Sequence, residues 1–280
     1  MTNGFLLIDK DTGMTSSRVV QIVKKKFQFK KVGHLGTLDP MATGLLILAI
    51  NRGTKFSSLL LESHKSYAAE ITLGIQTDTD DAEGEITSTN KVTCSKDEVN
   101  VKLLSFLGES QQFAPAYSAL KYQGKPMYKY AREGIKIDKE ARTIIIDQIS
   151  NISINLPKVS FEIVCSKGTY IRSIARDLGN QLECGGHLSN LIRTNQEKFF
   201  ISEATSIDEA CEEDIIPLEN AFKNLNSITL NQLDTNAFIN GVPLKLKIDH
   251  FDLLRVYDSS KKFIAIGKNT LHGFKHEYLV

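Results

Sequence analysis

The strongest candidate for chemistry in this chain is a carboxylate, Asp39, in the segment KVGHLGTLDPMATG that spans residues 31–44. Gly33 and Gly36 allow backbone angles that other residues avoid, so the segment can bend tightly and approach a ligand. Pro40 restricts the preceding aspartate to extended geometry, which fixes the direction of its side chain. The pattern predicts an acid presented on a rigid turn. A surface turn without chemical function is the alternative interpretation.

The same segment closely resembles the catalytic loop of the TruB family of tRNA pseudouridine synthases, whose pattern is GHxGTLDPxAxGxL. The residues that match this pattern are Gly33, His34, Gly36, Thr37, Leu38, Asp39, Pro40, Ala42, Gly44 and Leu45. The resemblance implies that Asp39 is the essential aspartate. It also implies that His34 contacts the RNA beside the target base and fills the space left by the flipped nucleotide.

A second candidate is Arg172, in the segment SKGTYIRSIARDLG of residues 166–179. This segment predicts a helix whose apolar stripe contains Ile171, Ile174, Ala175, Leu178 and Leu182. Arg172 lies off the stripe in the first helical turn, where the helix dipole disfavours a cation, so a carboxylate partner would suit it. A solvent-facing arginine is the alternative. The segment resembles the family's second signature, which implies that Arg172 pairs with Asp39 and that Tyr170 lines the base pocket.

Tyr67 and Leu191 complete the expected pocket. Tyr67 opens the alternating segment of residues 66–75, in which Tyr67, Ala69, Ile71, Leu73 and Ile75 share one face. A tyrosine on such a face is usually core, so its role as the ring that stacks on the flipped base and helps to move the C5 proton depends mainly on the resemblance. Leu191 falls at the family's pocket leucine. Ile192 and Glu197 stand where an arginine and a glycine are usual, so RNA contacts there are expected to be weaker or rearranged.

Pseudouridine formation breaks the bond from ribose C1′ to uracil N1, turns the base and rejoins it through C5. No electrons enter or leave, so we expect neither a cofactor nor a metal. The four cysteines are scattered without zinc-site spacing, and the loop TDTDDAEG of residues 77–84 fails the calcium-loop template. This loop resembles the family's TDTxDxxG loop, which implies a structural role. The carboxylate could attack C1′, attack C6 or remove a ribose proton. Burial would raise its pKa, and a guanidinium would restore the charged form.

Tyrosines and cations interleave in residues 117–146, a pattern that suits RNA because rings stack on bases and cations neutralise phosphates. The cations that we expect to contact the RNA backbone are Lys121, Lys125, Lys129, Arg132 and Arg142. A plain amphipathic surface helix from Pro126 to Glu133, ended by Gly134, is the alternative. The sequence YSALKYQGKPMYKYAREG resembles the thumb insertion with which stand-alone family members grip tRNA, so we name residues 117–146 the thumb segment.

Charge is also segregated elsewhere along the chain. Six cations and no acid lie between Asp11 and Asp39, whereas seven acids and no Lys or Arg lie between Lys198 and Lys223. The basic run should create a positive field beside the Asp39 turn, and the acidic run is expected to face elsewhere.

The 280 residues, 41% hydrophobic and 24% charged, are typical of a globular protein with a substantial core. Strands are expected at residues 5–10, 45–50 and 159–165, with a helix capped by Ser16 or Ser17 after the first. The resemblance implies an α/β (α+β) pseudouridine synthase fold, with a mixed, largely antiparallel central sheet flanked by helices. We expect a catalytic domain over residues 1–224 and a small PUA-like RNA-binding β module over residues 225–280.

The expected function is isomerisation of the T-loop uridine of tRNA, at position 55, after the base is flipped out of its stack. We expect a cytoplasmic monomer that binds the tRNA T-arm, with no membrane segment and no obligatory protein partner. An RNA-binding or tRNA-folding chaperone, with or without catalysis, is the alternative. The guide-RNA-dependent branch of the family is disfavoured by the thumb segment and the short C-terminal module. A hydrolase that uses Asp39 alone is least favoured, because no second carboxylate shows a matching motif.

Overall fold

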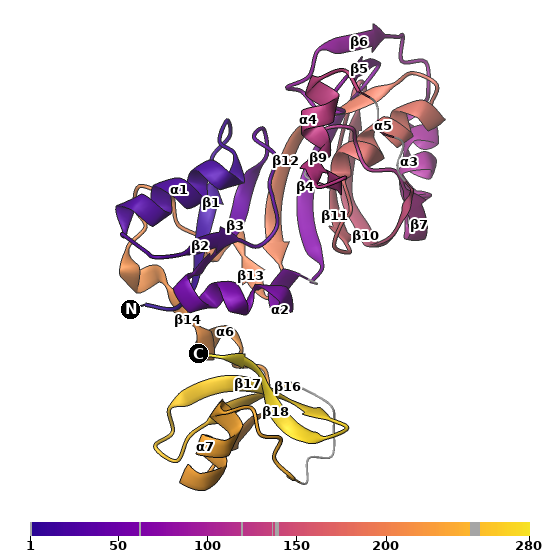
Figure 1. Ribbon diagram of the computed structural model, residues 1–280. Coiled ribbons are helices and arrows are strands. Elements are labelled where there is room, and N and C mark those ends of the chain that lie inside the picture. The colour runs from indigo at the N-terminus through magenta and orange to yellow at the C-terminus, as the bar shows by residue number, and fades with distance from the viewer. Residues whose placement is uncertain (1, 62, 119, 136, 138–139, 247–252) are drawn as a thin grey trace.

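The computed structural model describes residues 2–61, 63–118, 120–135, 137, 140–246 and 253–280 (Figure 1). Its main feature is a mixed ten-stranded sheet with the order β14-β1-β3-β12-β4-β11-β10-β7, in which β2 also pairs with β3 and β13 with β12. Within this sheet, as far as the described residues show, the β12–β3 pairing alone is parallel. The strands are β1 (Gly4–Lys10), β2 (Val32–His34), β3 (Thr43–Ile50), β4 (Lys65–Leu73), β7 (Gly108–Gln112), β10 (Arg142–Asn155), β11 (Lys158–Cys165), β12 (Gly186–Gln196), β13 (Phe199–Phe200) and β14 (Ile216–Pro217).

Helices α1 (Ser16–Lys26), α3 (Lys96–Leu104) and α5 (Ile171–Gln181) pack on this sheet around the larger core. The cap of α1 is Thr15, whose hydroxyl accepts a hydrogen bond from the backbone N–H of Arg18 at 3.1 Å. The predicted cap, Ser16 or Ser17, was therefore wrong by one or two residues. Ser16 is instead buried, and its hydroxyl exchanges hydrogen bonds with the backbone of Leu38.

Strand β3 is buried on both faces, as the sequence predicted. Leu46, Leu48 and Ile50 belong to the core under α1, while Leu45, Ile47 and Ala49 belong to a second core. Short elements surround this second core or follow the main strands: η1 (Asn51–Lys55), α2 (Ser57–Leu61), η2 (Ile201–Glu203), η3 (Glu212–Asp214) and α6 (Leu218–Ala221). The Asp39 turn, which enters β3, is thus attached to the most deeply buried strand of the sheet.

The alternating segment of residues 66–75 is broken by Gly74, whose φ of +86° lies in the left-handed region that favours glycine. Strand β4 ends at Leu73, and Ile75 begins β5 (Ile75–Thr77), which pairs with β6 (Ile86–Thr89) in a separate two-stranded sheet. Ile75 therefore does not share a face with Tyr67, contrary to the sequence expectation. The other four residues of that face are buried.

In the thumb segment, β8 (Lys121–Tyr122) pairs with β9 (Lys125–Pro126), and helix α4 (Met127–Arg132) follows. The helix expected from Pro126 to Glu133 is present, one residue shorter at each end, and Gly134 follows it. Strand β10 begins at Arg142 and pairs with β7, so residues 142–146 of the thumb segment belong to the central sheet. Residues 119, 136 and 138–139 of the segment lie outside the described residues.

The last part of the chain forms a four-stranded sheet, β15 (Ser227–Thr229), β16 (Leu253–Tyr257), β17 (Phe263–Thr270) and β18 (Gly273–Leu279), with helix α7 (Gln232–Ile239). It lies beneath the larger sheet in Figure 1 and packs on the second core. Here Phe56 and Tyr278 bring their ring centroids within 5.4 Å, and the Tyr278 hydroxyl lies 2.8 Å from the Ser58 hydroxyl. None of the helices in the described ranges has the length and apolar character that crossing a membrane requires.

The backbone of the acidic run contacts the basic run at one point. Lys26 Nζ donates to the carbonyl oxygens of Ile207 and Asp208 at 2.8 and 2.6 Å. The acidic run reaches this position because the chain returns beside β1 after β13, forming a bridge between Ile8 and Thr205 and then the β14–β1 pair.

Candidate active site

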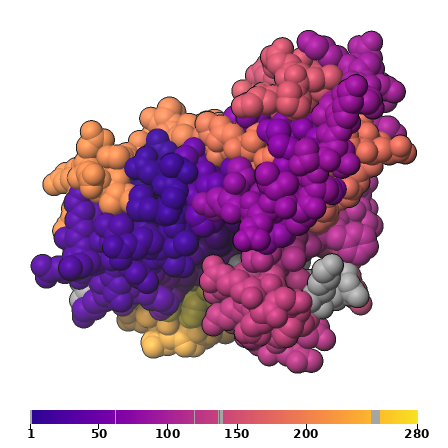
Figure 2. Space-filling view, turned by 90° about the horizontal axis from the view of Figure 1, so that it is seen from above, coloured from indigo at the N-terminus to yellow at the C-terminus, as the bar shows by residue number. Residues whose placement is uncertain are grey.

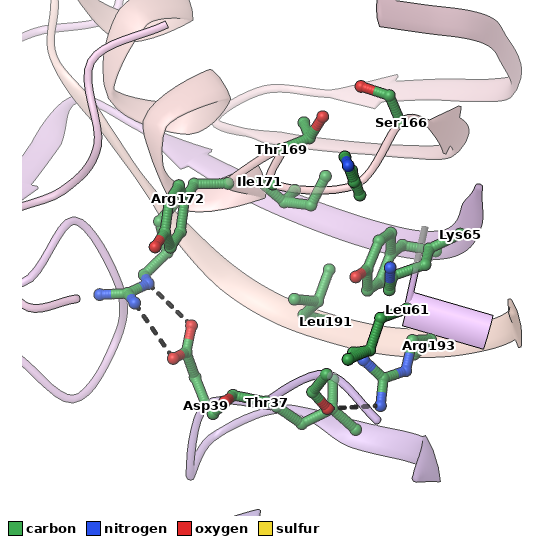
Figure 3. Close-up of a pocket in the computed structure, with 16 residues that line it drawn as sticks. Thr37, Asp39, Leu61, Lys65, Ser166, Thr169, Ile171, Arg172, Leu191 and Arg193 are labelled. Carbon is green, nitrogen blue, oxygen red and sulfur yellow. Dashed lines mark hydrogen bonds and ion pairs between the residues drawn. The ribbon is translucent and has the colours of Figure 1, made fainter. Parts of the chain in front are cut away.

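Asp39 and Arg172 form a two-point ion pair at the wall of a cavity (Figure 3). Arg172 Nε lies 2.8 Å from Asp39 Oδ2, and Nη2 lies 3.0 Å from Oδ1. The acid comes from the turn between β2 and β3, whereas the arginine comes from the first turn of α5. The side chain of Arg172 is only 4% exposed and that of Asp39 is 31% exposed. The pair that the sequence predicted is present.

Arg172 has further acceptors that the sequence did not identify. Its Nη1 donates to the carbonyl oxygen of Thr79 at 3.1 Å, and its Nη2 donates to that of Tyr117 at 3.0 Å. The buried carboxylate of Asp81 lies 3.6 Å from Nε. The loop of residues 77–84, interpreted from sequence as structural only, thus provides two of the groups around the guanidinium. The sequence shows that this loop contains several acids, but it does not show which of them faces Arg172.

The electrostatic environment of Asp39 contains two opposing influences. Burial raises the pKa of this carboxyl group above its usual range, and the Arg172 guanidinium is the largest influence that lowers the pKa again. Asp81 adds to the increase, and Lys10 adds to the decrease. The ionised form of Asp39 therefore depends chiefly on Arg172.

The Asp39 turn is held in place by the end of β1 and the turn before α1. Lys10 is fully buried, and its Nζ donates to the carbonyl oxygens of Asp11, Met14 and Pro40 at 2.8, 2.9 and 3.2 Å. Burial lowers the pKa of Lys10 to about 8. The backbone N–H of Gly13 also donates to the Pro40 carbonyl at 2.8 Å. The carboxylate is thereby presented on a braced turn.

The turn also approaches β12 closely at Gly44, where φ is +97°. A Cβ atom at this position would lie 2.5 Å from the carbonyl oxygen of Arg193, so only glycine fits. This contact fixes the turn against the strand that carries Leu191.

The cavity has a volume of about 290 Å³ and includes Tyr67, Tyr170 and Leu191 in its wall. Tyr67 and Leu191 are 8% and 6% exposed, on the adjacent strands β4 and β12. The Tyr170 backbone exchanges two hydrogen bonds with the Gln112 side chain, at 2.8 and 3.1 Å. Three predicted pocket residues therefore line the same cavity as the predicted ion pair.

His34 lies differently from the other predicted pocket residues. It ends β2, and the residues described in the cavity wall do not include it. Its Nδ1 is buried without a hydrogen-bond partner among the described residues. Burial lowers the pKa of His34, and the charge of Arg193 lowers it further.

Tyr67 faces a buried arginine across the sheet. Arg193 of β12 is its direct antiparallel partner, so both side chains lie on the same face. Burial raises the pKa of Tyr67 to about 12, and the nearby guanidinium opposes this increase. The hydroxyl is therefore protonated at neutral pH.

The predicted thumb cations lie outside the cavity wall. Lys121, Lys129 and Arg132 are exposed, and Lys125 Nζ lies 2.6 Å from Glu133. Arg142 lies at the start of β10, with its guanidinium 5.1 Å from the centroid of the Tyr170 ring, rather than on the helical part of the thumb segment.

The thumb segment is joined to the ion pair through Tyr117. Its carbonyl oxygen accepts the hydrogen bond from Arg172, and its hydroxyl donates to Asp78 Oδ2 at 3.0 Å. Seen from above, the surface is hollowed between the indigo-to-violet N-terminal residues and the pink residues of the thumb segment (Figure 2). The thumb segment therefore borders the approach to the site.

Comparisons with known proteins identify the family of the chain. The family described as "TruB family pseudouridylate synthase (N terminal domain)" matches residues 24–171. The chain belongs to this family. It is 41% identical to the tRNA pseudouridine synthase B of Clostridium kluyveri over 98% of both chains, and 38% identical to that of Burkholderia pseudomallei over 95% of this chain and 93% of the relative.

Solved structures show the same fold. A chain of an H/ACA RNP bound to a substrate RNA containing 2′-deoxyuridine has a TM-score of 0.72 and 23% identity, with 99% of this chain and 84% of that chain covered. A chain of a Cbf5-Nop10-Gar1 complex has a TM-score of 0.70 and 25% identity, and the match covers 96% of this chain and 79% of that chain. The pseudouridine synthase fold expected from sequence is confirmed. The protein is a pseudouridine synthase, an isomerase that converts uridine into pseudouridine.

Removal of the guanidinium should change both the rate and its pH dependence. In Arg172→Met, we expect the single-turnover rate at pH 7 to fall by several orders of magnitude, because Asp39 is left buried without its main counter-charge. The acidic limb of the rate profile should also move to higher pH, since the pKa of Asp39 rises and activity is lost as pH falls through that pKa. Single-turnover assays from pH 5 to 9 check this, and an unchanged profile would contradict the ion pair's role.

Proposed function

We propose that this enzyme isomerises the T-loop uridine of tRNA at position 55, with Asp39 as the essential carboxylate. The observation that carries the proposal is the Asp39–Arg172 pair at the wall of a cavity that Tyr67 and Leu191 also line. The relatives named tRNA pseudouridine synthase B, which match along nearly the whole chain, support tRNA as the substrate.

The roles of the site residues follow from the chemistry. The target base must leave its stack, which costs a few kcal/mol, and stacking on an aromatic ring recovers about 1–3 kcal/mol. Tyr67 supplies this ring, while Tyr170 and Leu191 form the walls and His34 supports the RNA beside the cavity. Asp39 then acts at the sugar–base junction, either as nucleophile or as base. Because the Tyr67 hydroxyl is protonated at neutral pH, it is suited to donating a hydrogen bond while the base turns.

RNA binding is assigned to the basic surfaces around the cavity. Lys121, Lys125, Lys129 and Arg132 would contact phosphates of the T-arm, with Arg142 at the base of the thumb segment. The basic run on α1 and the C-terminal four-stranded sheet would extend this surface. We assign residues 1–224 to catalysis and residues 225–280 to an RNA-binding module.

We also propose that the enzyme acts as a cytoplasmic monomer without an obligatory protein partner or a cofactor. The support for a monomer is that Asp39 and Arg172 belong to the same chain, so the ion pair needs no residue of a second subunit.

Asp39→Asn should separate catalysis from binding. We expect turnover to be abolished, because an amide can act neither as nucleophile nor as base, while tRNA affinity stays within a few fold of the wild type. The measurement is pseudouridine mapping at single-nucleotide resolution in unmodified tRNA transcripts, together with filter binding. A near-normal yield in the variant would contradict the role of Asp39. Modification only at a position other than 55 would contradict the proposed target.

Neutralising the exposed thumb cations should weaken binding in a salt-dependent way. In a variant with Lys121, Lys129 and Arg132 changed to Gln, we expect lower tRNA affinity and a smaller slope of log affinity against log salt, because each lost phosphate contact removes roughly 0.7–0.9 from that slope. Changing Lys91, Lys96 and Lys102 to Gln is the matched control, since these cations lie away from the thumb segment along the chain. Identical salt slopes in the wild type and the thumb variant would contradict the assignment.

A further inference from the structure

The end of the cavity opposite the Asp39–Arg172 pair contains two buried cations. Figure 3 shows Lys65 and Arg193 on one side of Leu191 and the ion pair on the other. The two ends differ in charge, because Arg172 is accompanied by the carboxylates of Asp39 and Asp81. Among the described residues, neither Lys65 nor Arg193 has a carboxylate within ion-pair distance.

The Lys65 ammonium group has N–H donors that form no hydrogen bond with the described residues of the protein. It begins β4 two residues before Tyr67, so both side chains lie on the same face of the strand, and Lys65 is only 8% exposed. An ammonium group has three N–H donors. Within the described chain, its one hydrogen bond is to the carbonyl oxygen of Ser63, at 3.2 Å. The remaining donors are available to a ligand in the cavity.

Arg193 places a fixed charge behind this lysine. It is fully buried, its Nε donates to the carbonyl oxygen of Leu45 at 2.6 Å, and its Nη2 donates to that of Gly36 at 3.2 Å. Its Nη1 makes no hydrogen bond of standard geometry in the described part of the protein, and the Tyr67 hydroxyl is the acceptor beside the guanidinium. Burying a cation without an anion is costly, so a site that retains two such cations is suited to a ligand that brings negative charge.

We propose that Lys65 donates a hydrogen bond to a carbonyl oxygen of the flipped uracil. Its charge, supported by Arg193, stabilises the negative charge that the uracil acquires during the reaction. This inference rests on the proposed binding of the target uridine in the cavity, with its sugar at Asp39. The opposite edge of the base then points toward Lys65.

Each route open to Asp39 places negative charge on a uracil carbonyl oxygen. If the carboxylate attacks C1′, or if a ribose proton is removed, the C1′–N1 bond breaks and its electron pair leaves with uracil, where it is shared by N1, O2 and O4. If the carboxylate adds to C6, the electron pair of the C5–C6 double bond moves toward C5 and O4. In the C1′ route, the C1′–O bond to Asp39 breaks as C5 bonds to C1′, and the carboxylate is released. In the ribose-proton route, the abstracted proton returns to the ribose as the C1′–C5 bond forms. In the C6 route, the C1′–N1 bond breaks, C5 bonds to C1′, and the C6–O bond to Asp39 then breaks. In every route C5 loses its proton and N1 gains one. No oxidant, reductant or second substrate is required.

The groups around Lys65 determine the pH range in which its ammonium group is charged. The titratable groups that face it are Tyr67 on its own strand, Cys165 on β11, Arg193 on β12 and Lys167 in the cavity wall. Burial, together with the charge of Arg193, lowers the pKa of Lys65 to about 8. Burial raises the pKa values of Cys165 and Tyr67 to about 12, so neither provides an anion at neutral pH. The free enzyme should lose the ammonium form as pH rises through 8.

The test compares Lys65→Met and Lys65→Arg with the wild type on unmodified tRNA. In Lys65→Met, we expect the single-turnover rate at saturating enzyme to fall about 100-fold, the loss typical of removing one donor to a developing oxyanion. The tRNA dissociation constant should stay within a few fold, and Lys65→Arg should recover part of the rate. The wild-type profile of kcat/KM should decline above about pH 8. The Lys65→Met profile should lack this decline.

Controls separate this role from a structural one. Lys158→Met removes an exposed lysine from β11 of the same sheet and should leave the rate near that of the wild type. Lys65→Met should melt at the wild-type temperature or above, because it replaces a buried unpaired charge with an apolar side chain of similar length.

Three results would overturn the inference: a rate within threefold of the wild type, a loss confined to tRNA affinity as for a phosphate contact, or a retained decline near pH 8 in Lys65→Met. A wild-type enzyme that leaves tRNA unmodified would instead defeat the proposed function.

Discussion

A buried arginine that requires carboxylates is the constraint on which the site depends. Arg172 is almost completely removed from solvent, so its charge must be compensated inside the protein. Asp39 and Asp81 provide that compensation, and the carbonyl oxygens of Thr79 and Tyr117 satisfy further donors. The same charge opposes the increase in the pKa of the Asp39 carboxyl group that burial causes. Three chain segments distant in sequence are thereby held around one guanidinium.

The cavity therefore has two electrostatically different ends. The end at Asp39 combines carboxylates with one guanidinium, whereas the end at Lys65 and Arg193 is cationic. A uridine that gains positive character at its sugar and negative character at its base during bond cleavage would be complementary to this arrangement. Catalysis by oriented charges needs rigid supports. Lys65 and Arg193 lie on strands β4 and β12 of the central sheet, whereas Asp39 lies on a braced turn and Arg172 on the first turn of α5.

The sequence predicted the parts of the structure that periodicity and local chemistry determine. The doubly buried β3, the helix that carries Arg172 and the apolar face that begins at Tyr67 all produce patterns that a linear reading detects. The pair of Asp39 with Arg172 could be predicted because a cation in the first turn of a helix needs an anion and because two family signatures supplied the candidates.

The remaining features depend on contacts that no local pattern encodes. Asp81 lies in a loop with several similar acids, and its position opposite Arg172 is decided by the path of that loop. Lys65 and Arg193 are polar residues at buried positions, where periodicity predicts apolar side chains. The end of β4 at Leu73 was missed because Gly74 adopts a left-handed backbone that periodicity does not reveal.

The protonation state of Asp39 provides the most direct test of this account. Its carboxyl ¹³C resonance, assigned through its absence in Asp39→Asn, can be followed by NMR as a function of pH in the wild type and in Arg172→Met. We predict that the wild-type carboxyl group is ionised at pH 7 and that its pKa is higher in the variant. A wild-type group that is protonated at pH 7, or the same pKa in both proteins, would contradict the central role of the ion pair.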